Sequence, residues 1–342
     1  MFLKSVIRFA IVGLAVLSVL GTIGCSSGDK GALVWVWYPN ESTPERAASR
    51  AAIIEVVSEA IGRNIEEQLT TDYSIAIESI VHGNAAMSWL GGEGYVRANS
   101  RDQAIQALVV HTGESGSLDD AKYYAMLGAR KENGGDYIKD GEYSLETFRQ
   151  KNFSFVSNSS TSGFVVPSSI ISSHFNVESE ELLEGGRGKV FSEVLFGGSH
   201  QGALLNVLEK RADVGAFCNT CIAHYMSFTK GDFGDPKPGD VFRINNDAVA
   251  PFDRFAGEEI VLVATVPVLN ECVVVNGNIL SEDEIEKIRK VLTSDEVTNN
   301  RQIFGSRKDA QNPSFFEAGQ RFVPVEDAWY NPVRVMSGLP LR

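Results

Sequence analysis

FSFVSNSSTSGFVVP, residues 153–167, is the stretch of this chain that decides the fold. Its first four residues, Phe153–Val156, alternate aromatic and small side chains, and this pattern predicts a strand. A polar turn centred on Ser160-Thr161-Ser162-Gly163 follows, and then an apolar run that suits a helix or another strand. A strand, a hydroxyl-rich turn and a helix start leave several backbone N–H groups unpaired and pointing at one spot. Such a spot attracts an anion, and the three hydroxyls add donors without a fixed charge.

The same turn has a second interpretation as an ordinary N-cap, in which hydroxyls satisfy the first helical N–H groups and bind nothing else. Pro167 lies several residues into the apolar run. A proline there requires either a helix that begins later than Thr161 or an irregular first turn.

The first 24 residues predict a secretory signal peptide. Lys4 and Arg8 precede an apolar run over residues 9–20, and small residues then lead to Cys25. The run is short for a membrane span. Because a small residue before a cysteine resembles a bacterial lipobox, we expect cleavage before Cys25 and a diacylglyceryl thioether on its sulfur. Residues 25–31 would then form a flexible tether. Plain signal-peptide cleavage and an uncleaved anchor are the alternatives.

The composition is strongly acidic. The 342 residues include 44 Asp and Glu against 31 Lys and Arg, a formal net charge of −13, and loss of the signal would remove two more positive charges. This charge disfavours nucleic acid or an anionic membrane surface as a partner. An anionic ligand would have to be held by local dipoles against the overall field. The length suits one large domain or two.

Strands and helices alternate through the first part of the chain, which predicts parallel βαβ units. In open sheets of this kind, ligands bind beyond the carboxyl ends of the strands. Tyr38, Tyr73 and a glycine loop over residues 91–95 lie at such ends. The expected strands are 32–38, 65–71 and 85–90, and the expected helices are 45–61 and 74–81.

A second unit of the same kind is expected from Phe153 onward. Residues 229–253, rich in Gly, Pro and Asp, are typical of an exposed excursion, and Ser281 with Glu284 predicts a capping box. Further strands are expected over 107–111, 123–129, 190–196, 213–217, 259–268 and 272–275, and helices over 201–210 and 285–292.

Several segments together resemble one family, the phosphate/phosphite/phosphonate-binding proteins of ABC importers. The resemblance runs from about residue 33 to 292 and implies an α/β periplasmic-binding-protein fold, type II-like. Each of the two lobes would be a mainly parallel sheet flanked by helices, with hinge strands and a cleft for a small phosphorus oxyanion. The segments are Thr71-Asp72-Tyr73, Trp89 before a glycine loop, Ser160-Thr161-Ser162-Gly163 with Pro167, and Gly198-Ser199-His200.

The resemblance also implies roles for single residues. The three hydroxyls of the turn would donate to ligand oxygens, His200 would donate from its ring, and Tyr73 would face the cleft. Tyr123 is similar to a second family tyrosine, with Tyr124 as the alternative. The expected ligand-binding residues are Ser160, Thr161, Ser162, His200, Tyr73, Tyr123, Cys221 and Asn270.

The chain departs from the family pattern at an acidic position. Members that take aminoalkylphosphonates place a carboxylate after an Asn-Thr pair, whereas Cys221 follows Asn219-Thr220 here. A second family acidic position falls near Asn270 or Glu271. Loss of one carboxylate disfavours an ammonium-bearing ligand, because a buried cation without a partner is costly. Glu93 is a residue that could restore the charge.

Cys218-x-x-Cys221 admits four interpretations: a redox dithiol, half of a zinc site, a structural disulfide, or two reduced buried thiols. No second Cys or His pair follows at zinc-binding spacing, and the motif comes too late in the chain for a thioredoxin-type site. A disulfide or reduced thiols are therefore favoured. We expect no metal and no cofactor.

An enzyme is the rival class, with Ser160 or Ser162, His200 and Asp213 as a hydrolase triad. No Gly-x-Ser-x-Gly motif is present, and a Ser-Thr-Ser turn suits multiple donation better than one nucleophile. We therefore expect a binding protein rather than an enzyme. A protein of the same fold that serves a sensor kinase or chemoreceptor is a further alternative.

The resulting prediction is a monomeric, extracytoplasmic, lipid-anchored binding protein that delivers a phosphorus oxyanion to an ABC permease. Residues 1–24 would be the signal and 25–31 the tether. Lobe 1 would comprise 32–130 and 262–342, and lobe 2 would comprise 131–261.

Overall fold

The computed structural model describes residues 31–307 and 313–342, and one compact unit comprises Ala32–Arg342. The predicted signal peptide and Cys25 lie outside the described residues. Within the described part of the chain, no helix combines the length and apolar character needed to cross a membrane.

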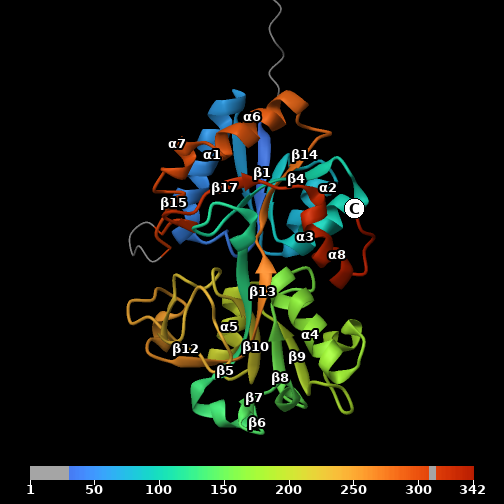
Figure 1. Cartoon of the computed structure of the whole chain (residues 1–342), viewed down its shortest axis with the longest axis vertical. Coiled ribbons are helices and arrows are strands. Elements are labelled where there is room, and N and C mark those ends of the chain that lie inside the picture. Colours follow the sequence, from blue (N-terminus) through green and yellow to red (C-terminus); the bar gives the residue numbers. More distant parts are fainter. Residues whose placement is uncertain (1–30, 308–312) are drawn as a thin grey trace, which may run out of the picture. The chain divides into compact units, whose positions relative to one another are not determined.

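The first sheet has six strands in the order β17-β4-β14-β3-β1-β2 (Figure 1). β1 pairs in parallel with β2 and β3, whereas β14 and β17 pair antiparallel with their neighbours. Its strands are β1 (Leu33–Trp37), β2 (Ile65–Leu69), β3 (Met87–Leu90), β4 (Ile105–His111), β14 (Cys272–Asn276) and β17 (Phe322–Pro324).

The second sheet has seven strands in the order β11-β12-β13-β5-β10-β8-β9. β8 pairs in parallel with β9 and β10, and the other pairs are antiparallel. Its strands are β5 (Lys122–Arg130), β8 (Asn152–Phe155), β9 (Glu193–Phe196), β10 (Val214–Cys218), β11 (Met226–Lys230), β12 (Val241–Ile244) and β13 (Glu259–Leu269). Two small ribbons pair β6 (Ile138–Lys139) with β7 (Glu142–Tyr143) and β15 (Phe304–Gly305) with β16 (Phe316–Glu317).

The structure confirms the α/β class and corrects two details of it. Both sheets are mixed rather than mainly parallel, because the strands that carry the chain between them run against the βαβ strands. The predicted exposed excursion over 229–253 is also wrong in part. It contains β12, which pairs with β13 and extends the second sheet.

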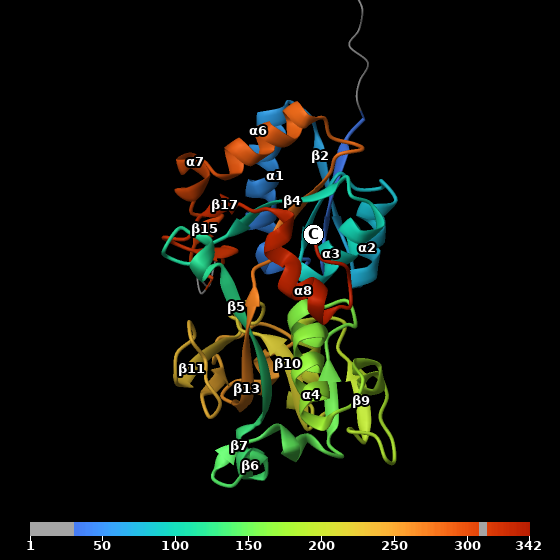
Figure 2. The same ribbon diagram turned by 45° about the vertical axis from the view of Figure 1, so that its right-hand side comes forward.

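Helices cover both faces of each sheet, as Figures 1 and 2 show. The capping box of Ser281 and Glu284 is confirmed at the start of α6. The expected loop over 91–95 is instead the first turn of α3. The helices are α1 (Ala47–Ile61), α2 (Tyr73–Val81), α3 (Gly92–Arg101), α4 (Val166–Phe175), α5 (His200–Leu208), α6 (Glu282–Leu292), α7 (Asp295–Thr298) and α8 (Asn331–Met336).

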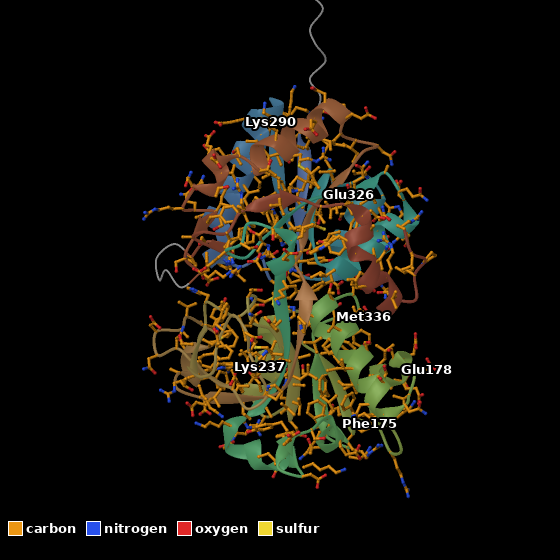
Figure 3. The ribbon with its side chains drawn as sticks, in the orientation of Figure 1. Phe175, Glu178, Lys237, Lys290, Glu326 and Met336 are labelled. Carbon is orange, nitrogen blue, oxygen red and sulfur yellow. A yellow bond between two sulfur atoms is a disulfide. The ribbon has the colours of Figure 1, made fainter. Side chains whose placement is uncertain are left out.

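Apolar side chains fill the layers between helices and sheets. Trp35 and Trp37 stack 5.1 Å apart on one face of the first sheet, while Val36 packs on the other face. This alternation follows from the two-residue period of a strand. Charged side chains such as Lys237 and Lys290 lie on the outside (Figure 3). Apolar side chains are therefore buried in separate clusters against the two sheets, and the site lies at the strand ends.

Two long strands connect the sheets. β5 and β13 pair from Arg130 opposite Ile260 to Lys122 opposite Leu269, so both belong to the second sheet over their full length. The chain leaves the first sheet after His111 and re-enters it at Cys272. The chain therefore passes between the two sheets at 112–121 and at 270–271. The lobe limits of 130/131 and 261/262 stay a prediction. The residues between the charged ends of β5 and the residues after Glu259 in β13 are mostly apolar.

We expect Ser281→Ala to lower the free energy of unfolding by about 1 kcal/mol, because the Ser281 side chain caps the Glu284 N–H at the start of α6. Denaturant unfolding measures this loss. Ser100→Ala is the matched control, since Ser100 is an exposed helical serine that caps no helix. Equal stability of the two variants would contradict the role of the cap.

Candidate ligand-binding site where the two sheets meet

The hydroxyl-rich turn after β8 opens an irregular helix. Ser160 is the N-cap, and its hydroxyl accepts a hydrogen bond from the Gly163 N–H at 3.1 Å. Thr161–Val165 forms a π-helical turn before α4, which accommodates Pro167 in the first turn of α4. The N-cap interpretation is thus correct for Ser160. Ser162 and Thr161 use their hydroxyls differently.

Four helices begin close to one another at this point. They are α2 at Tyr73, α3 at Gly92, the π-helical turn at Thr161, and α5 at His200. Asn40, which follows β1, links two of them. Its Nδ2 donates to the Tyr73 hydroxyl at 2.5 Å, and its Oδ1 accepts from the His200 N–H at 3.1 Å. Since a helix N-terminus carries partial positive charge, this convergence creates a positive potential inside an acidic protein.

His200 is held as a neutral hydrogen-bond donor. Its Nδ1 accepts from the Cys218 N–H at 3.0 Å, so the ring proton lies on Nε2. Burial lowers the pKa of His200 to about 3. Nε2 lies 3.4 Å from Ser162 Oγ, which also accepts from the Tyr123 hydroxyl at 3.1 Å. His200, Ser162 and Tyr123 therefore form one buried donor chain.

The two predicted tyrosines are buried as neutral phenols. Burial raises the pKa of Tyr73 and of Tyr123 well above the ordinary value. The Ser160 hydroxyl lies beside the Tyr73 hydroxyl. Tyr124, the alternative to Tyr123, instead donates to Asp235 at 3.0 Å. The structure thus groups Tyr73 and Tyr123, and not Tyr124, with the hydroxyl turn.

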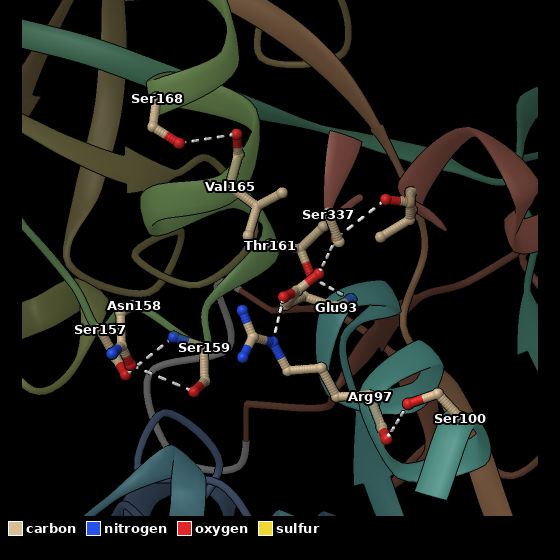
Figure 4. Close-up of polar contacts among 11 residues, drawn as sticks. Glu93, Arg97, Ser100, Ser157, Asn158, Ser159, Thr161, Val165, Ser168 and Ser337 are labelled. Carbon is tan, nitrogen blue, oxygen red and sulfur yellow. Dashed lines mark hydrogen bonds and ion pairs between the residues drawn. The ribbon is translucent and has the colours of Figure 1, made fainter. Parts of the chain in front are cut away.

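Thr161 joins the turn to the first residues of α3. The Glu93 N–H donates to Thr161 Oγ1 at 2.9 Å (Figure 4). A Cβ atom on Gly91 would lie 2.9 Å from the same oxygen, so this approach requires glycine. The Glu93 carboxylate, which is fully buried, accepts from Arg97 and Ser337. These partners direct Glu93 away from the role of an ammonium partner.

A cavity of about 40 Å³ adjoins the donor chain through Asn40. Acidic and basic side chains face each other across it, with Cys221 and three aromatic rings completing the wall. Its lining residues are Asn40, Glu41, Arg46, Trp89, His111, Thr220, Cys221, Glu271, Arg307, Phe315 and Phe316. The volume is enough for about three water molecules, and therefore for a small substituent.

The charged groups of this cavity are strongly perturbed. Burial, and next the Glu271 carboxylate, raise the pKa of Glu41 to about 8. Burial also raises the pKa of Glu271. It lowers the pKa of both arginines, Arg46 and Arg307, and that of Arg307 falls to about 10. Among the described residues, none hydrogen-bonds Glu41 Oε2, which is buried. The cavity therefore holds one carboxylate oxygen that no described residue uses as an acceptor.

Three of these residues were not predicted from the sequence: Glu41, Arg46 and Arg307. Glu41 lies beyond the carboxyl end of β1, and this position is the one feature of the sequence that could have marked it as a site residue. Arg46 and Arg307 come together only through packing of Phe315 and Phe316 between distant segments. No local pattern marks either arginine.

The remaining predicted residues are Asn270 and Cys221. Asn270 Nδ2 donates to the His111 carbonyl at 2.7 Å at the point where the chain changes sheets, and its neighbour Glu271 lines the cavity. Cys221 lines the cavity and is bonded to Cys218 in a disulfide. His200, Cys218 and Cys221 have ligating atoms within 4.8 Å of one another, but disulfide sulfurs lack the thiolate charge that zinc requires.

The proposed hydrolase triad is not assembled. His200 Nδ1 is occupied by the Cys218 N–H, and Asp213 Oδ2 accepts from the Asn152 N–H. With its proton on Nε2, His200 faces Ser162 as a donor and cannot accept the serine proton. The geometry therefore suits binding rather than nucleophilic attack.

We expect Glu41→Gln to change how stability depends on pH. Because the folded-state pKa of Glu41 is raised from 4.5 to about 8, the folded protein holds an extra proton between those values. Stability is therefore lost as pH rises through this window, by at most ~1.4 kcal/mol per pH unit. Denaturant unfolding of both proteins from pH 5 to 9 measures the difference. Parallel curves would contradict the raised pKa of Glu41.

Comparisons with known proteins agree with this geometry. A family model described as the periplasmic substrate-binding protein of phosphonate ABC transporters matches residues 35–330. The phosphate-import protein PhnD of Mycolicibacterium smegmatis is 22% identical over 298 residues, which cover 86% of this chain and 82% of that protein.

Two solved structures share the fold. PhnD1 from Prochlorococcus marinus in complex with methylphosphonate has a TM-score of 0.63 at 15% identity and covers 90% of this chain and 98% of its own. A binding protein component of an ABC phosphonate transporter from Pseudomonas aeruginosa has a TM-score of 0.62 at 17% identity. The match covers 90% of this chain and 85% of that protein. The chain therefore belongs to the family of periplasmic substrate-binding proteins of phosphonate ABC transporters, which confirms the predicted family and its non-enzymatic class.

Proposed function

We propose that this chain captures a phosphorus oxyanion between its two sheets and delivers it to an ABC permease. The observation that carries the proposal is the convergence of four helix N-termini with neutral hydroxyl, phenol and imidazole donors. Charge-assisted hydrogen bonds to a buried oxyanion are short and strong. A tetrahedral anion offers acceptors in several directions at once, and so suits donors that come from both sheets.

Closure of the two lobes follows from where these donors come from. Ser160, Ser162 and His200 belong to elements of the second sheet, and Tyr73 belongs to the first. The contact between Thr161 and the Glu93 N–H joins α3 to the hydroxyl turn. A ligand that binds both sets of donors would stabilise this closed arrangement relative to an open one.

The cavity restricts the class of ligand. Phosphate, phosphite and methylphosphonate each place at most one small group beyond the oxyanion, and a space of about 40 Å³ accepts such a group. The two relatives named for phosphate import and methylphosphonate binding support the same class. A sugar or peptide would need stacking surfaces or a longer groove.

The sequence supports a lipid anchor at Cys25. In this proposal, cleavage before Cys25 leaves a diacylated cysteine and a short tether, which hold the binding domain beside its permease on the outer side of the membrane.

We expect Ser162→Ala to weaken ligand binding by about ten- to a hundredfold, the usual value of a hydrogen bond to a charged group. Calorimetric titration with phosphate, phosphite, methylphosphonate and 2-aminoethylphosphonate measures this, with sulfate and taurine as controls. Ser168→Ala is the matched variant, because Ser168 is also buried, lies in α4 directly after the π-helical turn, and donates to the Val165 carbonyl at 3.0 Å (Figure 4). Unaltered affinity in Ser162→Ala, or no binding of any phosphorus compound, would contradict the proposal.

We expect Cys25→Ser to release the full-length protein from the membrane fraction, because serine cannot form the thioether. Metabolic labelling with a fatty acid, followed by fractionation, measures this. Cys272→Ser controls for loss of a thiol that is buried. Continued labelling of Cys25→Ser would exclude this residue as the lipidation site.

A further inference from the structure

The Cys218–Cys221 disulfide lies in the wall of the candidate ligand cavity. Cys218 is fully buried at the end of β10, whereas Cys221 is partly exposed and lines the cavity with Glu41 and Thr220. The two sulfurs therefore differ in access. An incoming nucleophile meets Cys221 first.

The position of this disulfide does not suit a structural cross-link. The two cysteines are three residues apart in sequence, with their Cα atoms 5.3 Å apart. Closing so short a loop restricts the unfolded chain far less than a long-range bridge does. Both cysteines already sit beside a paired strand, since β10 bonds to β5 and β8.

The surroundings of Cys218 favour its sulfur as a leaving group. Cys218 Sγ accepts a hydrogen bond from the Cys221 N–H at 3.0 Å, and the Thr220 hydroxyl lies 3.5 Å away as a second donor. Donors to a sulfur stabilise its thiolate form. A stabilised thiolate leaves faster in thiol–disulfide exchange.

The same loop is bonded to the donor chain of the ligand site. The Cys218 N–H fixes His200 with its proton on Nε2, and Gln201 Nε2 donates to the Cys221 carbonyl at 3.3 Å. His200 and Gln201 are the first two residues of α5. A change in the conformation of residues 218–221 would therefore alter the position of the His200 imidazole, which faces Ser162.

We propose that the Cys218–Cys221 disulfide is a redox-exchangeable site in the ligand cavity, with a dithiol as its reductant. A thiolate of the dithiol attacks Cys221 Sγ, the S–S bond breaks, and Cys218 leaves as a thiolate that then takes a proton. The second thiol of the reductant attacks the mixed disulfide and releases Cys221 as a thiol. The dithiol loses two electrons and two protons and becomes a cyclic disulfide, and the protein gains both.

The test treats the folded full-length protein with dithiothreitol, alkylates it at intervals and counts modified cysteines by mass. Cys218 and Cys221 should both become alkylated within minutes in buffer while the circular dichroism spectrum stays native. Cys272, which is buried, should remain unmodified. Reduction that occurs only in denaturant would overturn the proposal.

A pair of variants separates the effect of the hydrogen-bond donor beside Cys218 Sγ from a general loss of packing around the disulfide. Thr220→Val removes the hydroxyl donor beside Cys218 Sγ and should slow reduction about threefold, whereas Thr220→Ser should keep the original rate. Equal rates in all three proteins would show that the sulfur environment does not promote exchange, and would overturn that part of the proposal.

The coupling to ligand rests on the proposed function, and a separate arm tests it. Saturating methylphosphonate, or whichever phosphorus compound binds in the calorimetric series, should slow reduction several-fold, and the reduced protein should bind it several-fold more weakly. Binding without either effect would overturn the coupling while leaving the proposed function intact. If no compound binds, the proposed function and the coupling fail together, and the dithiothreitol and Thr220 experiments still decide whether the disulfide exchanges.

Discussion

The positive potential at the start of four helices is the constraint on which the site depends. The chain carries a net charge of −13, so an anion approaching it meets a repulsive field. Backbone dipoles act over a short range and are strongest where water is excluded. The burial of Ser160, Ser162, His200 and Tyr73 places the donors in such an environment. Neutral donors add hydrogen bonds there without the desolvation cost of a further buried cation.

Neutrality of His200 is essential to this arrangement. A protonated imidazole would add charge, but it would also lose the acceptor that the Cys218 N–H uses. Its low pKa, which follows from burial, keeps the ring neutral across the physiological range, and the Cys218 N–H selects the tautomer. The imidazole is therefore a directional donor whose orientation is set from the protein side.

The sequence predicted the parts of the site that have local signals. The turn of Ser160 to Gly163 and the position of His200 after two glycines are visible as strand–turn–helix junctions, and the cap of α6 follows from two residues three apart. Strand direction was less predictable. Whether β13 and β14 run with or against their neighbours depends on how the chain crosses between sheets, and no residue pattern within a strand records this.

Residues that reach the site over a long distance could not be found in this way. Arg46 and Arg307 meet the cavity only because the aromatic residues Phe315 and Phe316 bring separate segments together. Glu93 was visible in the sequence, but its role was not. Its carboxylate is taken by Arg97 and by Ser337, which is 244 residues away in the chain, while its N–H bonds Thr161.

Asn270 shows how the crossing between sheets and the site depend on each other. Its Nδ2 donates to the His111 carbonyl at the end of β4, its N–H donates to the Ala121 carbonyl just before β5, and its carbonyl accepts from Tyr330. One residue thus joins both chain crossings to the first sheet. Because Glu271 comes next, the same contacts fix the carboxylate that faces Glu41 across the cavity. Any movement of one sheet relative to the other would therefore pivot close to the wall of this cavity. In the proposed function, closure of the lobes would then also change the shape of the cavity.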